Sequence, residues 1–246
     1  MVNLVGFNTV LLEDLADKHL QNRIDNKYVV HESMLPDLLN GMKLQYDCLE
    51  INGLRSSNYT TWYYDTDNLK CYHDTRLGKP RRYKFRFRKY HNGDLSFFEI
   101  KNKIKGIRTL KERIPVSEMD ILAPDVQAFL LSRNIDPTTL NASLRISYDR
   151  VCLISNQNED RVTIDTNIII YQDNKTIDLK GVAVIEVKHK NIKDKTDFAE
   201  MLRGHRIKKS KFSKYCIGLG LIKKDINLTG ISKKVAWLKG ITNTLN

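Results

Sequence analysis

The sequence predicts an α+β protein built on a closed antiparallel β-barrel, with helices around it and at its C-terminal end. Two observations lead to this prediction: many segments alternate charged with apolar residues, and only a few helical segments interrupt them. Strand residues alternate between the two faces of a sheet, so each such segment has one charged and one apolar face. Many mostly basic faces of this kind suit a barrel with a polar interior and a covered exterior. We expect that interior to be wet, because isolated buried charges are costly.

The charged strands are spread along the chain, with no internal repeat. They are predicted near 23–30, 82–90, 96–103, 161–171 and 182–190, and Asn92-Gly93 predicts a hairpin between the second and third. Their charged faces carry Arg23, Asp25 and Lys27; Lys84, Arg86 and Arg88; Glu99, Lys101 and Lys103; Arg161 and Asp165, with Thr163 between them; and Glu186, Lys188 and Lys190.

The other elements are predicted from periodicity and punctuation. Further strands are predicted at 59–65, 69–74 and 143–155. Helices are predicted at 8–20, 32–42 and 117–131, and over most of the chain from about residue 194. No linker divides the chain, so we expect a single domain over residues 1–246.

Composition points to a polyanionic partner. The 246 residues include 41 Lys plus Arg against 29 Asp plus Glu, a net charge of +12. The four cysteines, Cys48, Cys71, Cys152 and Cys216, have no metal or redox spacing, which favours a reduced cytoplasmic protein. No apolar run is long enough to span a bilayer, and the N-terminal segment does not resemble a signal peptide. Attachment to the inner face of a membrane through a partner stays open.

The charged strands themselves predict a metal–phosphate site. The sequence contains no Gly-rich phosphate loop, nucleophile elbow or HExxH motif, so an enzyme acting on phosphates would use side chains. Arginine offers two-pronged hydrogen bonds to phosphate oxygens, and lysine offers a point charge. The interspersed acids are suited to a divalent cation that bridges to phosphate oxygens.

An ordered series of motifs resembles the VTC domain family of the triphosphate tunnel metalloenzymes. The series runs RIDNKYVV (23–30), YYDTD (63–67), GKPRRYKFRFR (78–88), FFEIKNK (97–103), KER (111–113), RISYDR (145–150), RVTID (161–165), IEVK (185–188) and SKFSKY (210–215). The resemblance covers nearly the whole chain and implies an antiparallel β-barrel tunnel. The fungal proteins of this family also carry a sensor domain and transmembrane helices, for which this chain has no room. We therefore expect a stand-alone domain of the bacterial type.

The resemblance implies a polyphosphate polymerase that uses ATP together with Mn²⁺ or Mg²⁺. The residues that it implies for catalysis are Lys27, Arg86, Arg88, Lys101 and Arg150. With the alternation of the strands, it also implies phosphate or nucleotide contacts from Arg23, Lys84, Lys103, Tyr148, Arg161, Lys188, Lys211, Ser213 and Lys214, the last three from a helical segment that closes over the phosphates. Glu186 is the expected metal ligand, with Glu99 and Asp165 as second choices.

Two other functions stay open at this stage. One is a tripolyphosphatase, or a nucleoside or RNA triphosphatase, on the same fold; such relatives usually carry Glu-x-Glu-x-Lys where this chain has Arg23-Ile24-Asp25-Asn26-Lys27. The other is a non-catalytic binder of polyphosphate. We expect no nucleic-acid partner, because the aromatic and basic residues of 82–90 fall on opposite strand faces, unlike a base-stacking surface. The oligomeric state stays open.

Overall fold

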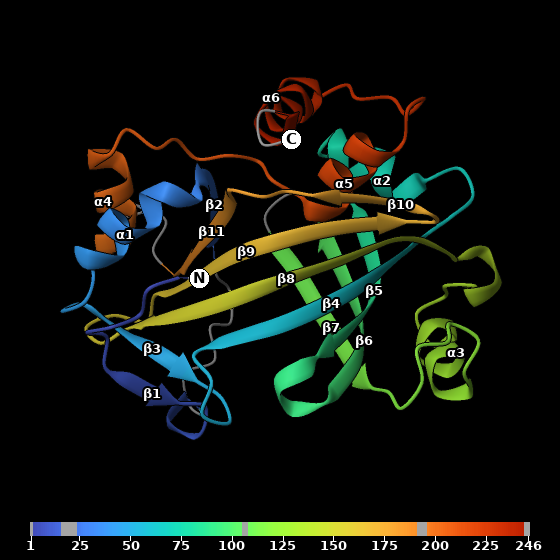
Figure 1. Cartoon of the computed structure of the whole chain (residues 1–246). Coiled ribbons are helices and arrows are strands. Elements are labelled where there is room, and N and C mark those ends of the chain that lie inside the picture. The colour runs from blue at the N-terminus through green and yellow to red at the C-terminus, as the bar shows by residue number, and fades with distance from the viewer. Residues whose placement is uncertain (1, 16–23, 105–107, 191–195, 244–246) are drawn as a thin grey trace. The chain divides into compact units, whose positions relative to one another are not determined.

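Antiparallel strands make up most of the regular structure in the computed structural model, which describes residues 2–15, 24–104, 108–190 and 196–243 (Figure 1). The chain forms two compact units, each assembled from three segments. Unit 1 comprises residues 1–58, 148–168 and 180–212, and unit 2 comprises 59–147, 169–179 and 213–246. The predicted α+β class with antiparallel strands is confirmed, whereas the single domain stays a prediction.

Unit 1 is centred on strand β11 (Val182–His189), which lies between β2 (Ile24–His31) and β9 (Arg161–Gln172) in antiparallel register. The second half of β8 (Asn141–Ser155) follows β9. A short β1 (Thr9–Leu11) pairs in parallel with β3 (Tyr46–Glu50), which also pairs with β8. Helices α1 (Leu35–Asn40) and α4 (Asp197–Gly204) complete the unit.

The alternation of β2 and β11 sorts their side chains between a core face and a charged face. Tyr28, Val30, Ile185 and Val187 are buried in one hydrophobic cluster together with leucines of α1 and with Phe198 of α4. Burying a large apolar side chain contributes about 1.5–3 kcal/mol, so this face holds the two helices against the sheet. The intervening charged residues necessarily project from the opposite face.

Unit 2 is built on the successive antiparallel strands β4 (Ser56–Asp65), β5 (Arg82–Tyr90), β6 (Leu95–Ile104) and β7 (Arg108–Pro115). The end of β9 pairs with β10 (Lys175–Asp178). Its helices are α2 (Lys70–Arg76), α3 (Pro124–Leu131), α5 (Lys214–Ile222) and α6 (Ser232–Asn243). As Figure 1 shows, α2 and α6 lie beside α5.

Aromatic residues form the core face of the β5–β6 hairpin. Phe87 and Phe98 are fully buried with ring centroids 4.8 Å apart, and Phe129 of α3 meets Phe98 edge-on at 6.2 Å. The predicted hairpin is confirmed, and its loop is a 3-10 turn at His91–Gly93 followed by Asp94 in the left-handed region at φ 47°.

Several predicted elements are wrong. Residues 9–15 form strand β1 and the 3-10 turn Glu13–Leu15 rather than a helix, and residues 16–20 of that prediction lie outside the described residues. Residues 70–76 form helix α2 instead of a strand, because Thr66 Oγ1 and the Asp65 carboxylate accept hydrogen bonds from its first N–H groups. Helix α3 begins only at Pro124, whose fixed φ suits the first helical position.

The C-terminal part is less helical than predicted. Helix α4 ends at Gly204, and residues 205–213 form an irregular segment before α5. Arg206 lies in the left-handed region at φ 59°, and the Ile207 N–H turns back to the Leu202 carbonyl, which ends the helix. No helix among the described residues has the length and hydropathy to cross a membrane.

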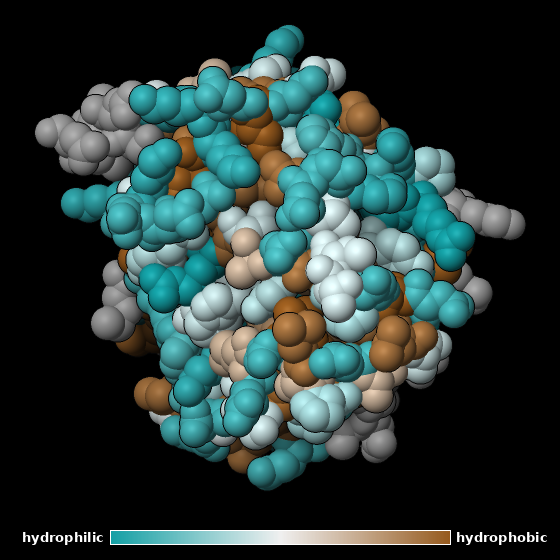
Figure 2. Space-filling model, turned by 90° about the vertical axis from the view of Figure 1, so that its right-hand side faces the viewer, coloured by the Kyte–Doolittle hydropathy of each residue, from teal (hydrophilic) through white to brown (hydrophobic). Residues whose placement is uncertain are grey.

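The surface reflects the high charge. Figure 2 shows one face of the molecule, where hydrophilic residues predominate and hydrophobic ones lie dispersed among them. Apolar side chains that are dispersed in this way are normal on a solvated surface, so they do not mark this face as an apolar docking site.

Candidate functional site

The charged face of unit 1 gathers predicted site residues from four strands. We call this set the β11 cluster; it consists of Lys27, Arg150, Arg161, Asp165, Glu186 and Lys188. Glu186 lies opposite Lys27 on β2 and Thr163 on β9, and its carboxylate accepts a hydrogen bond from Lys27. Lys188 lies two residues along, opposite Arg161, with its Nζ 3.9 Å from Glu186 Oε2. Cations therefore flank the single carboxylate of β11 from both sides.

A second ion pair orders the β8 side of the β11 cluster. Arg150 donates to both oxygens of Asp165, from Nε at 2.6 Å and from Nη2 at 2.8 Å. The guanidinium carbon also lies 5.2 Å from the centroid of the buried Tyr148 ring. The two-pronged bond and the ring contact fix the orientation of the guanidinium.

Lys188 is the most buried cation of the β11 cluster. Its residue is 9% exposed, and burial lowers the pKa of its ammonium group to about 8, although the Glu186 carboxylate opposes this shift. Arg150 contributes further to the lowering by like-charge repulsion. Keeping the Lys188 side chain charged in this buried position therefore costs free energy, and a bound anion would offset that cost.

The charged face of unit 2 carries the second set of predicted site residues. We call it the β6 cluster; it consists of Lys84, Arg86, Arg88, Glu99, Lys101 and Lys111. Glu99 is 1% exposed and sits at its centre. Its Oε2 accepts from Arg86 Nε at 2.7 Å and lies 3.6 Å from Arg88 Nη1, while Oε1 lies 2.6 Å from Lys111 Nζ. Burial raises the pKa of Glu99, but the three cations outweigh burial and hold that pKa well below its usual range.

Basic residues face basic residues across the strands of the β6 cluster. Lys84 is paired with Lys101, and Lys101 with Lys111, so three lysines form a row across β5, β6 and β7. Arg82 is likewise paired with Lys103. Directly paired residues project from the same face of a sheet, and like charges in that position are destabilising.

The start of helix α5 adjoins the lysine row. Ser213 caps α5 by accepting a hydrogen bond from the Cys216 N–H, and Lys84 Nζ donates to Ser213 Oγ at 3.0 Å. Lys214 is the first residue of the helix. Lys211, predicted on the same helix, instead lies in the irregular segment of unit 1, where the Ser210 N–H donates to the Lys27 carbonyl at 2.7 Å.

The structure thus brings the predicted residues together in two sets, one in each unit. Arg23 lies outside the described residues. The expectation of a wholly wet interior is wrong in part, because Arg88, Glu99, Asp165 and Lys188 are buried. Lys111 was missed because strand β7 was not predicted, although KER (111–113) stood in the series of motifs that carries the family resemblance.

A divalent cation fits one of the three predicted metal ligands. Thr163 Oγ1, on the residue paired with Glu186, is buried without a hydrogen-bond partner. One carboxylate with a neighbouring hydroxyl suits Mg²⁺ or Mn²⁺ held mainly by phosphate oxygens and water. Among the described residues no three His, Cys, Asp or Glu side chains group as an all-protein metal site. Glu99 and Asp165 do not fit, since both are buried and cations lie within 2.8 Å of both oxygens of each carboxylate, whereas the Lys188 Nζ is 3.9 Å from Glu186 Oε2.

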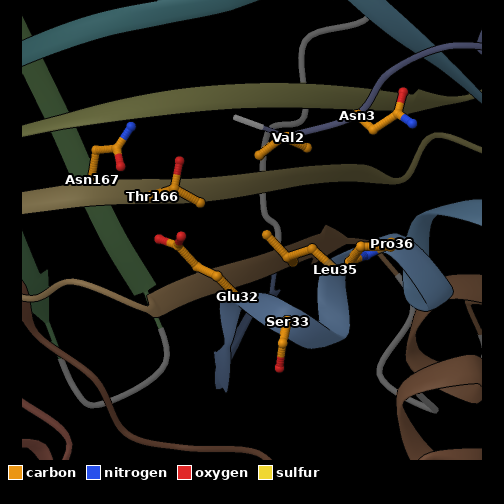
Figure 3. A pocket seen from close by; sticks show the side chains of 8 residues that line it. All are labelled: Val2, Asn3, Glu32, Ser33, Leu35, Pro36, Thr166 and Asn167. Carbon is orange, nitrogen blue, oxygen red and sulfur yellow. The ribbon is translucent and has the colours of Figure 1, made fainter. Parts of the chain in front are cut away.

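A cavity of about 300 Å³ lies elsewhere in unit 1 (Figure 3). The Glu32 carboxylate points into it from the start of the α1 region, toward Thr166 and Asn167 of β9. Its lining, as far as the structure describes it, includes no basic residue: Val2, Asn3, Glu32, Ser33, Leu35, Pro36, Thr166 and Asn167. A carboxylate without a neighbouring cation repels phosphate, so this cavity is not the candidate site.

Several solved structures are similar to this chain, and the first of them supports the fold. A proposed adenylate cyclase from Bacillus halodurans is 14% identical with a TM-score of 0.53, and the match covers 78% of this chain and 96% of that one. A protein from Pyrococcus horikoshii OT3 is 13% identical (TM-score 0.46), with 80% of this chain and 98% of that one covered. A proposed adenylyl cyclase from Hippeastrum, described as having a dominant triphosphatase activity, is 12% identical (TM-score 0.46), with 80% and 93% covered.

The family assignment comes from the sequence. No curated protein matches the chain significantly. The profile of the VTC domain matches residues 22–223, a range that contains every strand of both charge clusters. The chain therefore belongs to the VTC domain family, and its fold is similar to that of the Bacillus halodurans protein.

Proposed function

We propose that this protein is a polyphosphate polymerase, which transfers the terminal phosphoryl group of ATP to a growing polyphosphate chain. The observation that carries the proposal is the row Lys84, Lys101 and Lys111 across three adjacent strands. Such a row is unfavourable in the empty protein and becomes favourable when a multiply charged anion lies along it. A polyphosphate chain supplies a negative charge at every unit and matches a repeated array of cations.

The buried acids give the arginines a fixed direction. Glu99 holds Arg86 and Arg88 from one side, and Asp165 holds Arg150 in unit 1. A guanidinium carries five N–H donors in one plane, so a carboxylate that fixes this plane also fixes the directions in which phosphate oxygens can approach. We assign Arg86, Arg88 and Arg150, with Lys27 and Lys101, to phosphate contacts in the transfer.

Phosphoryl transfer requires little covalent chemistry from the protein. Catalysis rests on placing donor and acceptor phosphates in line and on neutralising charge as it develops. Arrays of cations on a sheet face, such as those found in each unit, suit both purposes. A divalent cation bound at Glu186, Mn²⁺ or Mg²⁺, would neutralise further charge on the phosphate oxygens. Many moderate contacts would hold the polyphosphate product. The product could then shift by one phosphate without breaking all of these contacts, which would help its release.

Hydrolysis is the competing reaction, and strand β2 bears on it. Asp25 lies opposite Lys188, and Lys27 bonds Glu186, so the described part of β2 offers one acid next to cations. This composition favours holding a long anion over activating a water molecule.

Incubation of the protein with ATP and Mn²⁺, followed by gel separation of the products by length, tests the proposal. A metal-dependent ladder of long chains with stoichiometric ADP is the expected result. Orthophosphate without chains would instead establish a triphosphatase, and tight binding without turnover would establish a binder.

A matched pair of variants tests the lysine row in the same assay. Lys101→Ala should lower chain synthesis at least about tenfold, since a hydrogen bond to a charged group contributes about 1.5–3 kcal/mol and 1.4 kcal/mol is a factor of ten. Lys89→Ala is the control, because Lys89 belongs to the other face of β5 and pairs with Asp94 at 2.9 Å. Equal activity of the two variants would refute the role of the row.

A further inference from the structure

Asp65 is a buried acid of unit 2 that belongs to neither charge cluster. It ends strand β4, is 1% exposed, and lies on the same strand face as Thr61 and Tyr63. Those two residues are paired with Arg88 and Arg86, so Asp65 extends the charged face of the β5–β6 sheet. Its position beside cationic strands raises the question of what its charge does.

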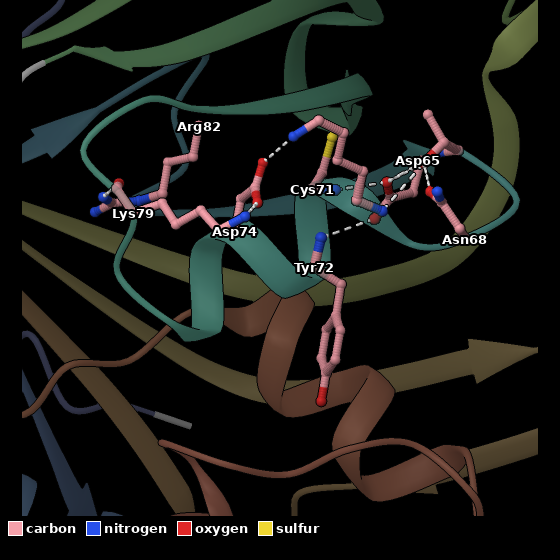
Figure 4. Close-up of polar contacts among 9 residues, drawn as sticks. Asp65, Asn68, Cys71, Tyr72, Asp74, Lys79 and Arg82 are labelled. Atoms are coloured by element: carbon pink, nitrogen blue, oxygen red, sulfur yellow. Dashed lines mark hydrogen bonds and ion pairs between the residues drawn. The ribbon is translucent and has the colours of Figure 1, made fainter.

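Among the described residues, the hydrogen-bond donors to Asp65 come from the adjacent Thr66 and from two helices rather than from the cationic strands. Figure 4 shows the donors from α2, the first of these helices. Oδ1 accepts from the Cys71 N–H at 2.8 Å, and Oδ2 accepts from the Tyr72 N–H at 2.9 Å, so the carboxylate caps α2. This cap is needed because Leu69, at the N-cap position, is in the left-handed region at φ 53° and provides no side-chain cap. The negative charge also suits the positive end of the helix dipole.

The second helix bound by Asp65 is α5. The Tyr215 hydroxyl donates to Asp65 Oδ2 at 2.6 Å and lies 3.1 Å from Ser143 Oγ. The Tyr215 ring stacks on Tyr63, with centroids 5.0 Å apart at 25°. Burial, and then the adjacent Asp65 carboxylate, raise the pKa of Tyr215, so the hydroxyl stays a proton donor.

Tyr215 lies within the first turn of α5, two residues after Ser213. Ser213 accepts a hydrogen bond from Lys84 Nζ, and Lys84 is the first of the three lysines in the row. The bond from Tyr215 to Asp65 therefore fixes the turn that presents Ser213 and Lys214 next to the row. Rigid support of this kind is what a binding group needs to hold its geometry to within a fraction of an ångström.

We propose that Asp65 and Tyr215 are positioning residues that hold the first turn of α5, and with it Lys84 and Ser213, in the geometry that binds phosphate. The inference rests on the proposed function of the same face. Neither residue touches the phosphates; both act through the start of α5.

The test is tripolyphosphate binding by calorimetry, with Tyr215→Phe as the main variant, because it removes the hydroxyl and keeps the ring stacked on Tyr63. The dissociation constant should rise about tenfold, as expected for loss of a hydrogen bond to a charged group. Tyr72→Phe is the matched control: Tyr72 is equally buried, and its hydroxyl donates at 2.8 Å to the Asn227 carbonyl, away from the row. Its dissociation constant should stay within about twofold of wild type, because Tyr72 binds Asp65 through its backbone N–H, which the substitution keeps.

A double-mutant cycle separates positioning from general destabilisation. If Tyr215 acts through Lys84, adding Tyr215→Phe to Lys84→Ala should weaken binding by less than about twofold further. Equal affinity of Tyr215→Phe and wild type, equal losses in the two tyrosine variants, or fully additive losses with Lys84→Ala would each overturn the inference. Wild-type protein that binds no tripolyphosphate would refute the proposed function itself.

Discussion

Glu99 and Glu186 both lie among cations, but they differ in burial and in the contacts of their carboxylate oxygens. Glu99 is almost completely buried and is engaged on both oxygens, so it acts as a counter-ion for Arg86, Arg88 and Lys111. The Glu186 side chain is 14% exposed and lies next to a buried hydroxyl without a partner. The first therefore stabilises the fold, and the second is placed for a metal ion.

Glu99→Gln should lower the free energy of unfolding by about 3–5 kcal/mol at pH 7, the usual cost of removing one partner of a buried ion pair. The pKa of Glu99 is lower in the folded state, so its contribution is present above the unfolded-state pKa of about 4.3 and is lost as the pH falls toward the folded-state pKa. Urea unfolding at a series of pH values should show the difference between wild type and variant shrinking below about pH 4.

Glu112→Gln is the control for this experiment. Glu112 of β7 pairs with Arg133 at 2.5 Å, but its side chain is 44% exposed. The free energy of unfolding should therefore fall by less than about 1 kcal/mol in this variant. A Glu99→Gln difference that is small at pH 7 or does not change with pH would contradict the counter-ion role.

Glu186→Gln should raise the Mn²⁺ concentration required for half-maximal activity by about tenfold or more, since altered metal environments typically cost 10–100-fold in affinity. The fold should be retained because this carboxylate is partly exposed. Titration of activity against Mn²⁺ measures the effect, with Glu159→Gln as control, an exposed acid that pairs with Lys190. An unchanged Mn²⁺ requirement would remove Glu186 from the metal site.

The close packing of helix α5 against the sheet depends on the small size of Gly218. A methyl group on Gly218 would lie 2.6 Å from Leu144 Cδ2 and 3.4 Å from Ile170 Cγ2, so the helix backbone comes close to the sheet residues of unit 2. Tyr215 to Ile222 are all buried. The helix is therefore held by close packing as well as by the Asp65 bond.

Gly218→Ala should destabilise the protein by about 1–3 kcal/mol through overpacking. Gly240→Ala, in α6, should be neutral or stabilising by up to about 1 kcal/mol, because no described residue outside its own helical turn lies within 4 Å of the added methyl group and alanine favours the helix. Thermal unfolding of both variants tests the contrast. Similar melting temperatures would mean that α5 can move away from the sheet.

Elements with a strict two-residue alternation were predicted most closely from sequence, and the strands β4 and β8 and the helix α1 were also predicted, whereas α2 and β7 were not. Strands β2, β5, β6, β9 and β11 follow their charge patterns closely. Helix α2 was mistaken for a strand because its start depends on Asp65 and Thr66, which precede it and act through side-chain caps. Strand β7 was missed because its pairing with β6, rather than its own composition, defines it.

At the scale of the whole molecule, the sequence predicted which residues face the charged side but not their partners. The pairing of Glu186 with Lys27 and of Glu99 with Lys111 depends on strand register, which alternation alone does not specify. The roles of Asp65 and Tyr215 likewise arise from contacts between distant segments. Residue type and alternation therefore predicted which side chains share a charged face, and topology decided which of them meet.

Both units are discontinuous in the chain, and this has a consequence for biosynthesis. Unit 1 needs residues up to 212, and unit 2 needs the residues from 213 onward. A nascent chain can therefore complete neither unit until most of it has left the ribosome, although domains commonly fold in order as they emerge. During that interval Lys27 of β2 is exposed without Glu186, its acidic partner 159 residues later on β11, so the newborn chain should be prone to capture by cellular polyanions.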